Sequence, residues 1–179
     1  MKLKIRSLCI VLAILLLVAV ICLSPAVQLH LTLIPYKLLT FGTVPDDMTL
    51  TIYYMDPSIL TRRAFTADDL KRNAISGEFD YAGACMKNFL ELEKHIDLLR
   101  RLDAFDLQPV EEKGYMNARL CYVFEVWGRD VLEVVMSTND SSVFVNGIEV
   151  ENNPIFLEAI APFMPEEMLE DWSVNDPAP

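Results

Sequence analysis

The sequence predicts an α+β domain with a mostly antiparallel sheet, preceded by an N-terminal transmembrane or signal helix. Three observations predict it. Residues 8–23 form an unbroken apolar run, residues 88–105 carry apolar side chains at helical spacing, and residues 119–150 alternate with a period of two. In chain order we expect a strand, a short helix, one long amphipathic helix and a β-meander, with the helices on one face of the sheet.

The first elements of the domain are a strand and a short helix. Residues 49–55 alternate polar and apolar side chains and are rich in β-branched and aromatic types, which predicts a strand that Pro57 ends. Residues 66–69 resemble a capping box that opens a helix, and Gly77 closes it. Residues 78–86 alternate weakly, so they permit a short strand.

The next element is the predicted long helix. Asn88 can cap it, Glu91 stands three positions on, and Pro109 prevents its continuation. Its apolar residues recur every three or four positions and predict a buried stripe: Phe89, Leu92, Ile96, Leu99, Leu102 and Phe105.

The meander follows. Residues 119–127 and 131–136 read as strands, and residues 143–145 and 148–150 flank Asn146-Gly147, the strongest short hairpin signal. A closing helix begins at Asn153-Pro154, and we expect its apolar side chains to face inward: Phe156, Ile160 and Phe163.

The long helix, the meander and the Phe144-Val145-Asn146-Gly147 segment together resemble small exported or membrane-anchored proteins of Gram-positive bacteria. The resemblance covers residues 49–164, includes no catalytic motif and implies no activity.

Two interpretations of the N-terminus remain open. Residues 1–26 have the basic start, apolar stretch and small-residue exit of a cleaved signal peptide. The favoured interpretation is an uncleaved anchor over residues 8–27, because 20 helical residues reach about 30 Å, the hydrocarbon thickness of a bilayer. Three basic residues precede the apolar run, and Lys37 is the only basic residue among the 20 residues that follow it. The rest of the chain is therefore predicted to lie outside the cytoplasm, on the cell membrane or, after cleavage, secreted.

These observations divide the chain into four parts. They are a transmembrane anchor or signal peptide (1–27), a juxtamembrane linker (28–47), an extracytoplasmic α+β domain (48–173) and a frayed tail (174–179).

The charge of the chain narrows its partners. The net charge of the whole chain is −11. When the three N-terminal basic residues are left out, 12 basic and 26 acidic residues remain, which is a net charge of −14. Nucleic acid is excluded, because its binding needs Lys and Arg to neutralise phosphates. A protein partner with a basic surface fits this charge.

No motif for a reaction occurs, so we predict no catalytic, cofactor-binding or metal-binding residues. His95 has no second His or Cys one helical turn away, as a zinc site requires. Cys85 and Cys121 permit a disulfide or two buried free thiols. Asp80 and Glu125 are an example of two acids that a glycosidase-like cleft would have to bring together.

The sequence therefore favours a binding or interaction domain without catalytic activity. Two alternatives remain: a cell-envelope hydrolase that uses a carboxylate pair, and an acidic immunity or inhibitor protein.

Overall fold

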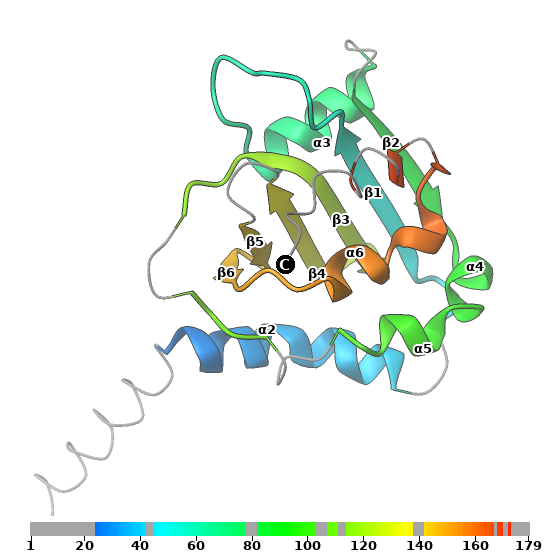
Figure 1. The fold of residues 1–179 in the computed structure, drawn as a ribbon. Helices are drawn as coiled ribbons and strands as arrows, with labels where there is room; N and C mark the ends of the chain where they lie inside the picture. Colours follow the sequence, from blue (N-terminus) through cyan, green and yellow to red (C-terminus); the bar gives the residue numbers. More distant parts are fainter. Residues whose placement is uncertain are drawn as a thin grey trace, which may run out of the picture.

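Figure 1 shows the computed structural model of the chain, in which one six-stranded sheet lies between helices. The structure describes residues 24–41, 45–77, 82–102, 107–110, 114–137, 142–166, 168–169 and 172. The strands are β1 (Thr49–Met55), β2 (Ala82–Lys87), β3 (Ala118–Val126), β4 (Arg129–Ser137), β5 (Val143–Val145) and β6 (Ile148–Val150). Their order is β2-β1-β3-β4-β5-β6 and every neighbouring pair is antiparallel, which confirms the α+β class and the antiparallel sheet.

The turns of the meander explain its register. Trp127 and Gly128 join β3 to β4, and Asn146 and Gly147 join β5 to β6, all four with positive φ. Such turns match the twist of the flanking strands, and asparagine and glycine adopt them at little cost. The Asn146 side chain also accepts a hydrogen bond of 2.8 Å from the backbone N–H of Glu133, which ties the hairpin to β4.

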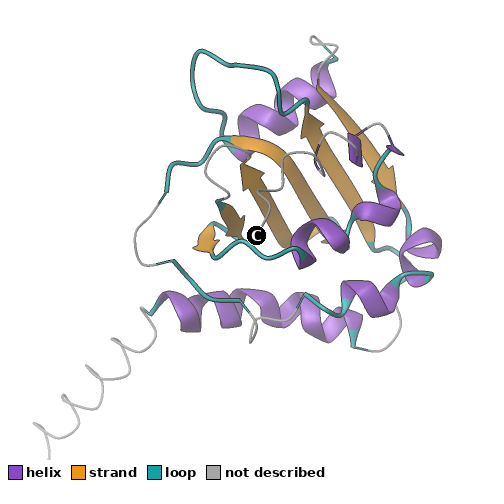
Figure 2. Ribbon diagram, in the orientation of Figure 1, coloured by secondary structure: helices purple, strands orange, loops and turns teal. Residues whose placement is uncertain are grey.

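Both faces of the sheet are buried, so the prediction that the helices lie on one face is wrong. Helices α2 (Pro25–Thr40), α4 (Phe89–Glu93), α5 (Ile96–Leu99) and α6 (Ile155–Glu158) lie on one face, and α3 (Ala67–Ser76) lies on the other (Figure 2). The reason is the near-continuous burial of β3, whose Tyr122 and Phe124 point to the first face and Cys121 and Val123 to the second. Because both faces of the sheet are apolar, each needs helices packed against it.

The predicted long helix is two short ones, α4 and α5, so that prediction is also wrong. The chain leaves helical geometry at His95, whose φ and ψ are −122° and 22°. The His95 ring packs edge-on against Phe163 with 5.2 Å between ring centroids. Leu92 and Leu99, on the two short helices, are both buried, and the capping box of Asn88 and Glu91 is confirmed.

Residues 25–40, most of which we predicted to be a linker, form helix α2 of the domain. Pro25 occupies its first turn, and Leu29, Leu33 and Tyr36 are buried in the main core. The Tyr36 hydroxyl donates to the Leu99 carbonyl over 3.0 Å. The spacing of these buried residues, four and then three, is that of a helix face packed on a sheet.

Within the described part of the chain, no helix has the length and apolar character needed to cross a membrane. The predicted anchor or signal segment lies outside the described residues up to residue 23, as do the turn at 138–141 and the tail at 174–179.

The closing helix is confirmed as short. The Asn153 side chain accepts a hydrogen bond from the Ile155 N–H at 3.0 Å, α6 follows, and a 3₁₀ turn, η1, spans Ala161–Phe163. Its predicted inward residues are buried, and the Tyr122 hydroxyl donates to the Phe156 carbonyl over 3.1 Å.

Candidate interaction site on the loop between β1 and α3

The loop of residues 56–66 stands out from the end of the sheet on the side away from α2 (Figure 1). It begins with an Asx turn, in which Asp56 Oδ1 accepts hydrogen bonds from the Ser58 backbone N–H and hydroxyl at 2.8 and 2.6 Å. Aspartate before proline favours such a turn because its side chain replaces a backbone acceptor. The loop therefore leaves β1 in a defined direction.

A buried arginine holds the middle of this loop from below. Arg119 on β3 is only 3% exposed, and its Nη2 donates to the Ile59 carbonyl at 3.2 Å and to Thr61 Oγ1 at 3.1 Å. Its guanidinium carbon lies 5.9 Å from the centroid of the Phe65 ring, within cation–π range. Burial lowers the pKa of Arg119.

No carboxylate of the described residues forms an ion pair with Arg119, and its Nε is buried without a hydrogen-bond partner there. A buried cation without an opposite charge costs stability. A core that served stability alone would favour an apolar side chain at this position. The contacts of Arg119 thus indicate a role in positioning the loop.

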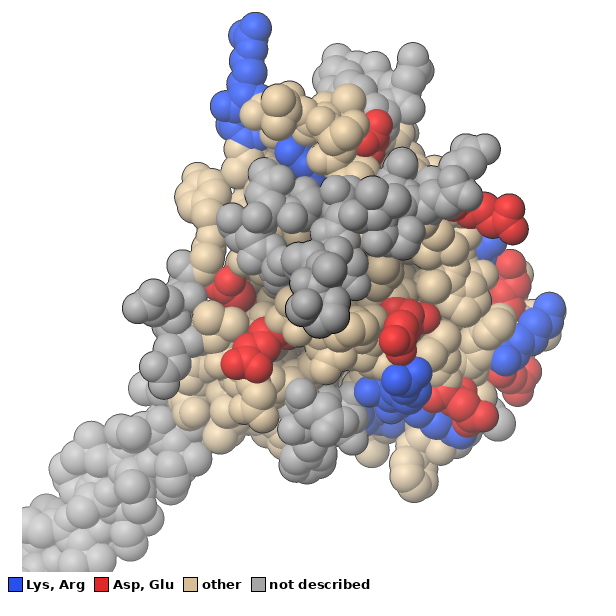
Figure 3. All heavy atoms as spheres, in the orientation of Figure 1, with Lys and Arg blue, Asp and Glu red and all other residues tan. Residues whose placement is uncertain are grey.

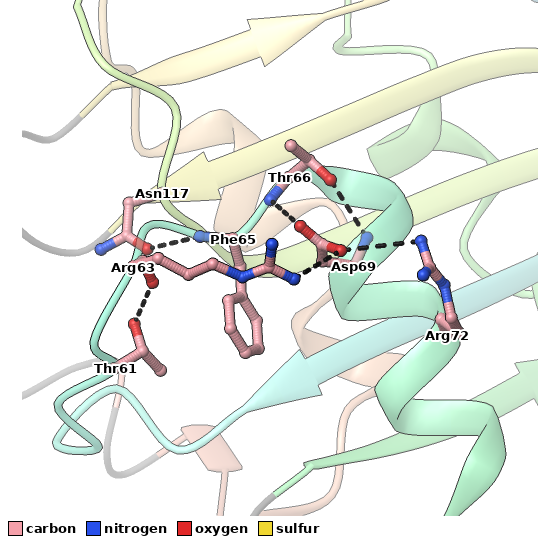
Figure 4. A network of polar contacts seen from close by, with 7 residues as sticks. All are labelled: Thr61, Arg63, Phe65, Thr66, Asp69, Arg72 and Asn117. Carbon is pink, nitrogen blue, oxygen red and sulfur yellow. Dashed lines mark hydrogen bonds and ion pairs between the residues drawn. The ribbon is translucent and has the colours of Figure 1, made fainter.

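The far end of the loop is fixed by β3 and by the helix that follows (Figure 4). The Phe65 N–H donates to Asn117 Oδ1 at 3.2 Å, and the Ala118 N–H donates to the Phe65 carbonyl at 2.8 Å. Thr66 and Asp69 form the reciprocal capping box that the sequence predicts. Both ends and the middle of the loop are therefore held.

Asp69 forms ion pairs with two arginines at this end of the loop. It lies 3.4 Å from Arg63 Nη2 and 3.6 Å from Arg72 Nη2, and Figure 4 shows both guanidinium groups turned toward it. The hydrogen bond from the Thr66 backbone, and then the two arginines, lower the pKa of Asp69. The Asp69 carboxylate is thus already paired, and the side chains of Arg62 and Arg63 are exposed at the surface.

The middle of the loop presents an exposed apolar side chain that is followed by two basic ones. Leu60 is 95% exposed, and Arg62 and Arg63 follow it. Residues 56–77 carry four basic and three acidic side chains, whereas the chain as a whole carries 15 and 26. In Figure 3, basic side chains project from the edge of the molecule that this loop forms. An ordered loop that presents an exposed leucine next to two arginines is suited to binding a protein surface.

The cysteines do not form the disulfide that the sequence permits. Both are free thiols, and they lie on opposite faces of the sheet, because Cys85 is paired with Ile52 and Cys121 with Tyr53. Strand β1 separates them, and two strand spacings of about 4.8 Å exceed the reach of a disulfide.

Cys121 also lacks the chemistry of a nucleophile. It is buried beside the ion pair of Lys71 and Glu133, and burial, reinforced by the charge of Glu133, raises its pKa to about 12. Its thiol is therefore protonated at neutral pH, and the thiolate is the reactive form.

Of the other residues considered from the sequence, the structure describes His95 and Glu125. His95 packs on Phe163, Glu125 is exposed at the end of β3, and Asp80 lies outside the described residues. Among the described residues, no three His, Cys, Asp or Glu side chains gather as a metal site requires.

Family models, curated proteins and solved structures were compared with the chain, and none matches. The sequence does not single out the loop as a site. The one available signal is Leu60-Thr61-Arg62-Arg63, an uncharged pair followed by two arginines in a chain dominated by acids.

Proposed function

We propose that the chain is an extracytoplasmic binding domain without catalytic activity, held at the cell membrane by its N-terminal segment or secreted after cleavage. We further propose that loop 56–66 is its contact with a protein partner. The observation that carries this proposal is Leu60, which is 95% exposed in the middle of a loop that the buried Arg119 holds in place.

A loop that is already ordered in the free domain is expected to bind its partner with higher affinity. A flexible loop loses conformational freedom when it binds, and a preorganised one has already lost it on folding. Three separate contacts restrain this loop: the Asx turn at Asp56, the hydrogen bonds of Arg119, and the pairing of Phe65 with β3. The partner can then use Leu60 as an anchor.

The charge around Leu60 defines the chemistry of the partner. An apolar pocket that accepts the leucine, with carboxylates at its rim opposite Arg62 and Arg63, complements the loop. An Arg–carboxylate pair at such a rim contributes more to specificity than to affinity.

The second candidate is an immunity or inhibitor protein for a basic enzyme or toxin, and the net charge of −14 beyond the N-terminal basic residues favours it. The two candidates differ in their salt dependence. Association steered by the acidic surface slows as salt rises, whereas an acidic pocket approaching an acidic domain associates faster as salt screens their repulsion.

The experiment that tests the loop places a photo-crosslinking side chain at position 60 of the full chain in the membranes of the organism that makes it. We expect one defined protein adduct at position 60, and its loss when Arg62 and Arg63 are both replaced by Ser. A crosslinker at Ile75, an exposed apolar residue on α3, is the matched control and is expected to give no such adduct. Equal adducts at positions 60 and 75, or none at 60, would contradict the proposed site.

A further inference from the structure

The outer side of helix α2 carries an exposed apolar stripe. Leu31, Ile34, Leu38 and Phe41 are between 37% and 87% exposed, and they follow one another at spacings of three, four and three residues. Residues at this spacing lie along one line of a helix. We call these four residues the α2 stripe.

The α2 stripe cannot turn into the core, because the opposite side of the helix is fixed there. Tyr36 is buried, its hydroxyl donates to the Leu99 carbonyl at 3.0 Å, and its ring lies 5.2 Å from that of Phe124. Asn146 Nδ2 donates to the Thr32 carbonyl at 3.1 Å. Arg100 Nε donates to the Thr40 carbonyl at 2.8 Å. These contacts, spread along the helix, fix its rotation and leave the stripe facing outward.

The surroundings of the α2 stripe indicate what covers it. Residues 8–23 are an unbroken apolar run that ends one residue before the helix cap at Ser24. Between residues 7 and 45 the only charged residue is Lys37, and no acid occurs before Asp46. An acid-free helix face that directly follows a 16-residue apolar run matches the interfacial region of a bilayer.

We propose that α2 is an interfacial helix whose stripe inserts into the membrane that the N-terminal segment enters, so that the domain rests on the bilayer through Leu31, Ile34, Leu38 and Phe41. This inference rests on the membrane attachment in the proposed function and adds an orientation to it. Loop 56–66 lies on the side of the domain away from α2 (Figure 1). A domain resting on α2 therefore presents Leu60 away from the lipid.

The test uses the full chain in lipid nanodiscs loaded with one copy each. An environment-sensitive dye is attached through a genetically encoded azide at position 38, or at position 75 as the control. The two sites are matched, since Leu38 is 73% and Ile75 is 71% exposed, but Ile75 is on α3, across the sheet. We expect the dye at position 38 to emit as in an apolar medium and to be quenched several-fold more strongly by nitroxide-labelled lipids than the dye at position 75.

A second variant checks that the stripe causes the docking. With the dye at position 34, replacing both Leu31 and Leu38 by Gln is expected to abolish lipid quenching. Replacing Ile75 by Gln should leave it unchanged. All replaced side chains are exposed, so circular dichroism should remain that of the parent chain.

The other outcomes overturn the proposal in distinguishable ways. If the chain stays with the nanodisc but the dye at position 38 reports water, the attachment holds and the docking is wrong. If the dye becomes apolar only in discs with two copies and lipid nitroxides do not quench it, the stripe binds a second copy instead. If the chain leaves the nanodisc, the attachment itself fails and the docking fails with it.

Discussion

Alkaline pH is expected to unfold the domain through three buried groups, and helix α2 supplies one of them. The hydroxyls of Tyr36 and Tyr122 donate to backbone carbonyls inside the core, and burial raises the pKa of both. Burial likewise raises the pKa of the Cys121 thiol from 9.0 to about 12. Each group is held neutral in the folded state, so unfolding releases its proton at high pH.

The sign and magnitude follow from linkage. A raised pKa in the folded state contributes stability that is complete below the unfolded pKa and is lost as pH rises above it. At pH 11, one unit above the ordinary tyrosine pKa, ionisation in the unfolded chain lowers the free energy of unfolding by roughly 1 kcal/mol for each tyrosine and by roughly 3 kcal/mol for the cysteine. The total of roughly 5 kcal/mol is comparable with the whole stability of an ordinary domain.

The assay is thermal unfolding of the full chain in detergent micelles between pH 8 and 12, followed by circular dichroism and by tyrosinate absorbance. We expect stability to fall slowly from pH 9 and about three times more steeply above pH 10. Replacing Tyr36 by Phe removes one titrating group and should reduce the slope above pH 10 by about a third. Replacing the exposed Tyr115 by Phe should not change it.

One result would contradict the burial of Tyr36 and Tyr122. If all six tyrosines ionise together near pH 10 while the circular dichroism stays native, Tyr36 and Tyr122 are not enclosed, and α2 does not pack as the structure has it.

The remaining predictions concern loop 56–66, the two cysteine thiols and the N-cap of α3. Replacing Arg119 by Met should release loop 56–66, so that trypsin cleaves after Arg62 several-fold faster while the circular dichroism is unchanged; an unchanged cleavage rate would show that Arg119 does not hold the loop. Cys85 and Cys121 should remain free thiols, so the alkylated mass should be the same with and without reductant; a lower mass without reductant would reveal a disulfide. Replacing Thr66 by Ala should lower the free energy of unfolding by about 1 kcal/mol, measured by thermal melts, and no change would discount the capping box.

The sheet was the part of the fold most readily predicted from sequence, because its signals are local. Period-two alternation and Asn146-Gly147 specify β3 to β6 from adjacent residues, and the capping boxes at Thr66 and Asn88 appear where their motifs stand. These elements depend on hydrogen bonds between neighbours in the chain.

The predicted long helix and the predicted linker were wrong because contacts between residues far apart in the sequence determine the structure there. The stripe of residues 88–105 fits one helix, but the contact of His95 with Phe163 divides it. Residues 28–40 resemble a linker because apolar side chains occur on both sides of α2. Only packing on the sheet distinguishes the buried Leu33 from the exposed Leu38.

The candidate site was less predictable than the fold. Asp56-Pro57 marks the start of a loop, but its restraint depends on Arg119, about 60 residues further along the chain. That contact follows from the pairing of β1 with β3, in which Tyr54 lies opposite Leu120, so Arg119 emerges beside the loop. No local pattern in the sequence encodes this register.

The most direct test of the proposed orientation on the membrane is energy transfer from a dye on the domain to acceptor dyes on lipid headgroups. It is measured for the full chain in nanodiscs. The dye is placed once at Leu38, on the α2 stripe, and once at Leu60, on the loop. We expect strong transfer from position 38 and weak transfer from position 60, because the domain is proposed to rest on α2 and to present the loop away from the membrane. Equal transfer from both positions, or stronger transfer from position 60, would contradict it.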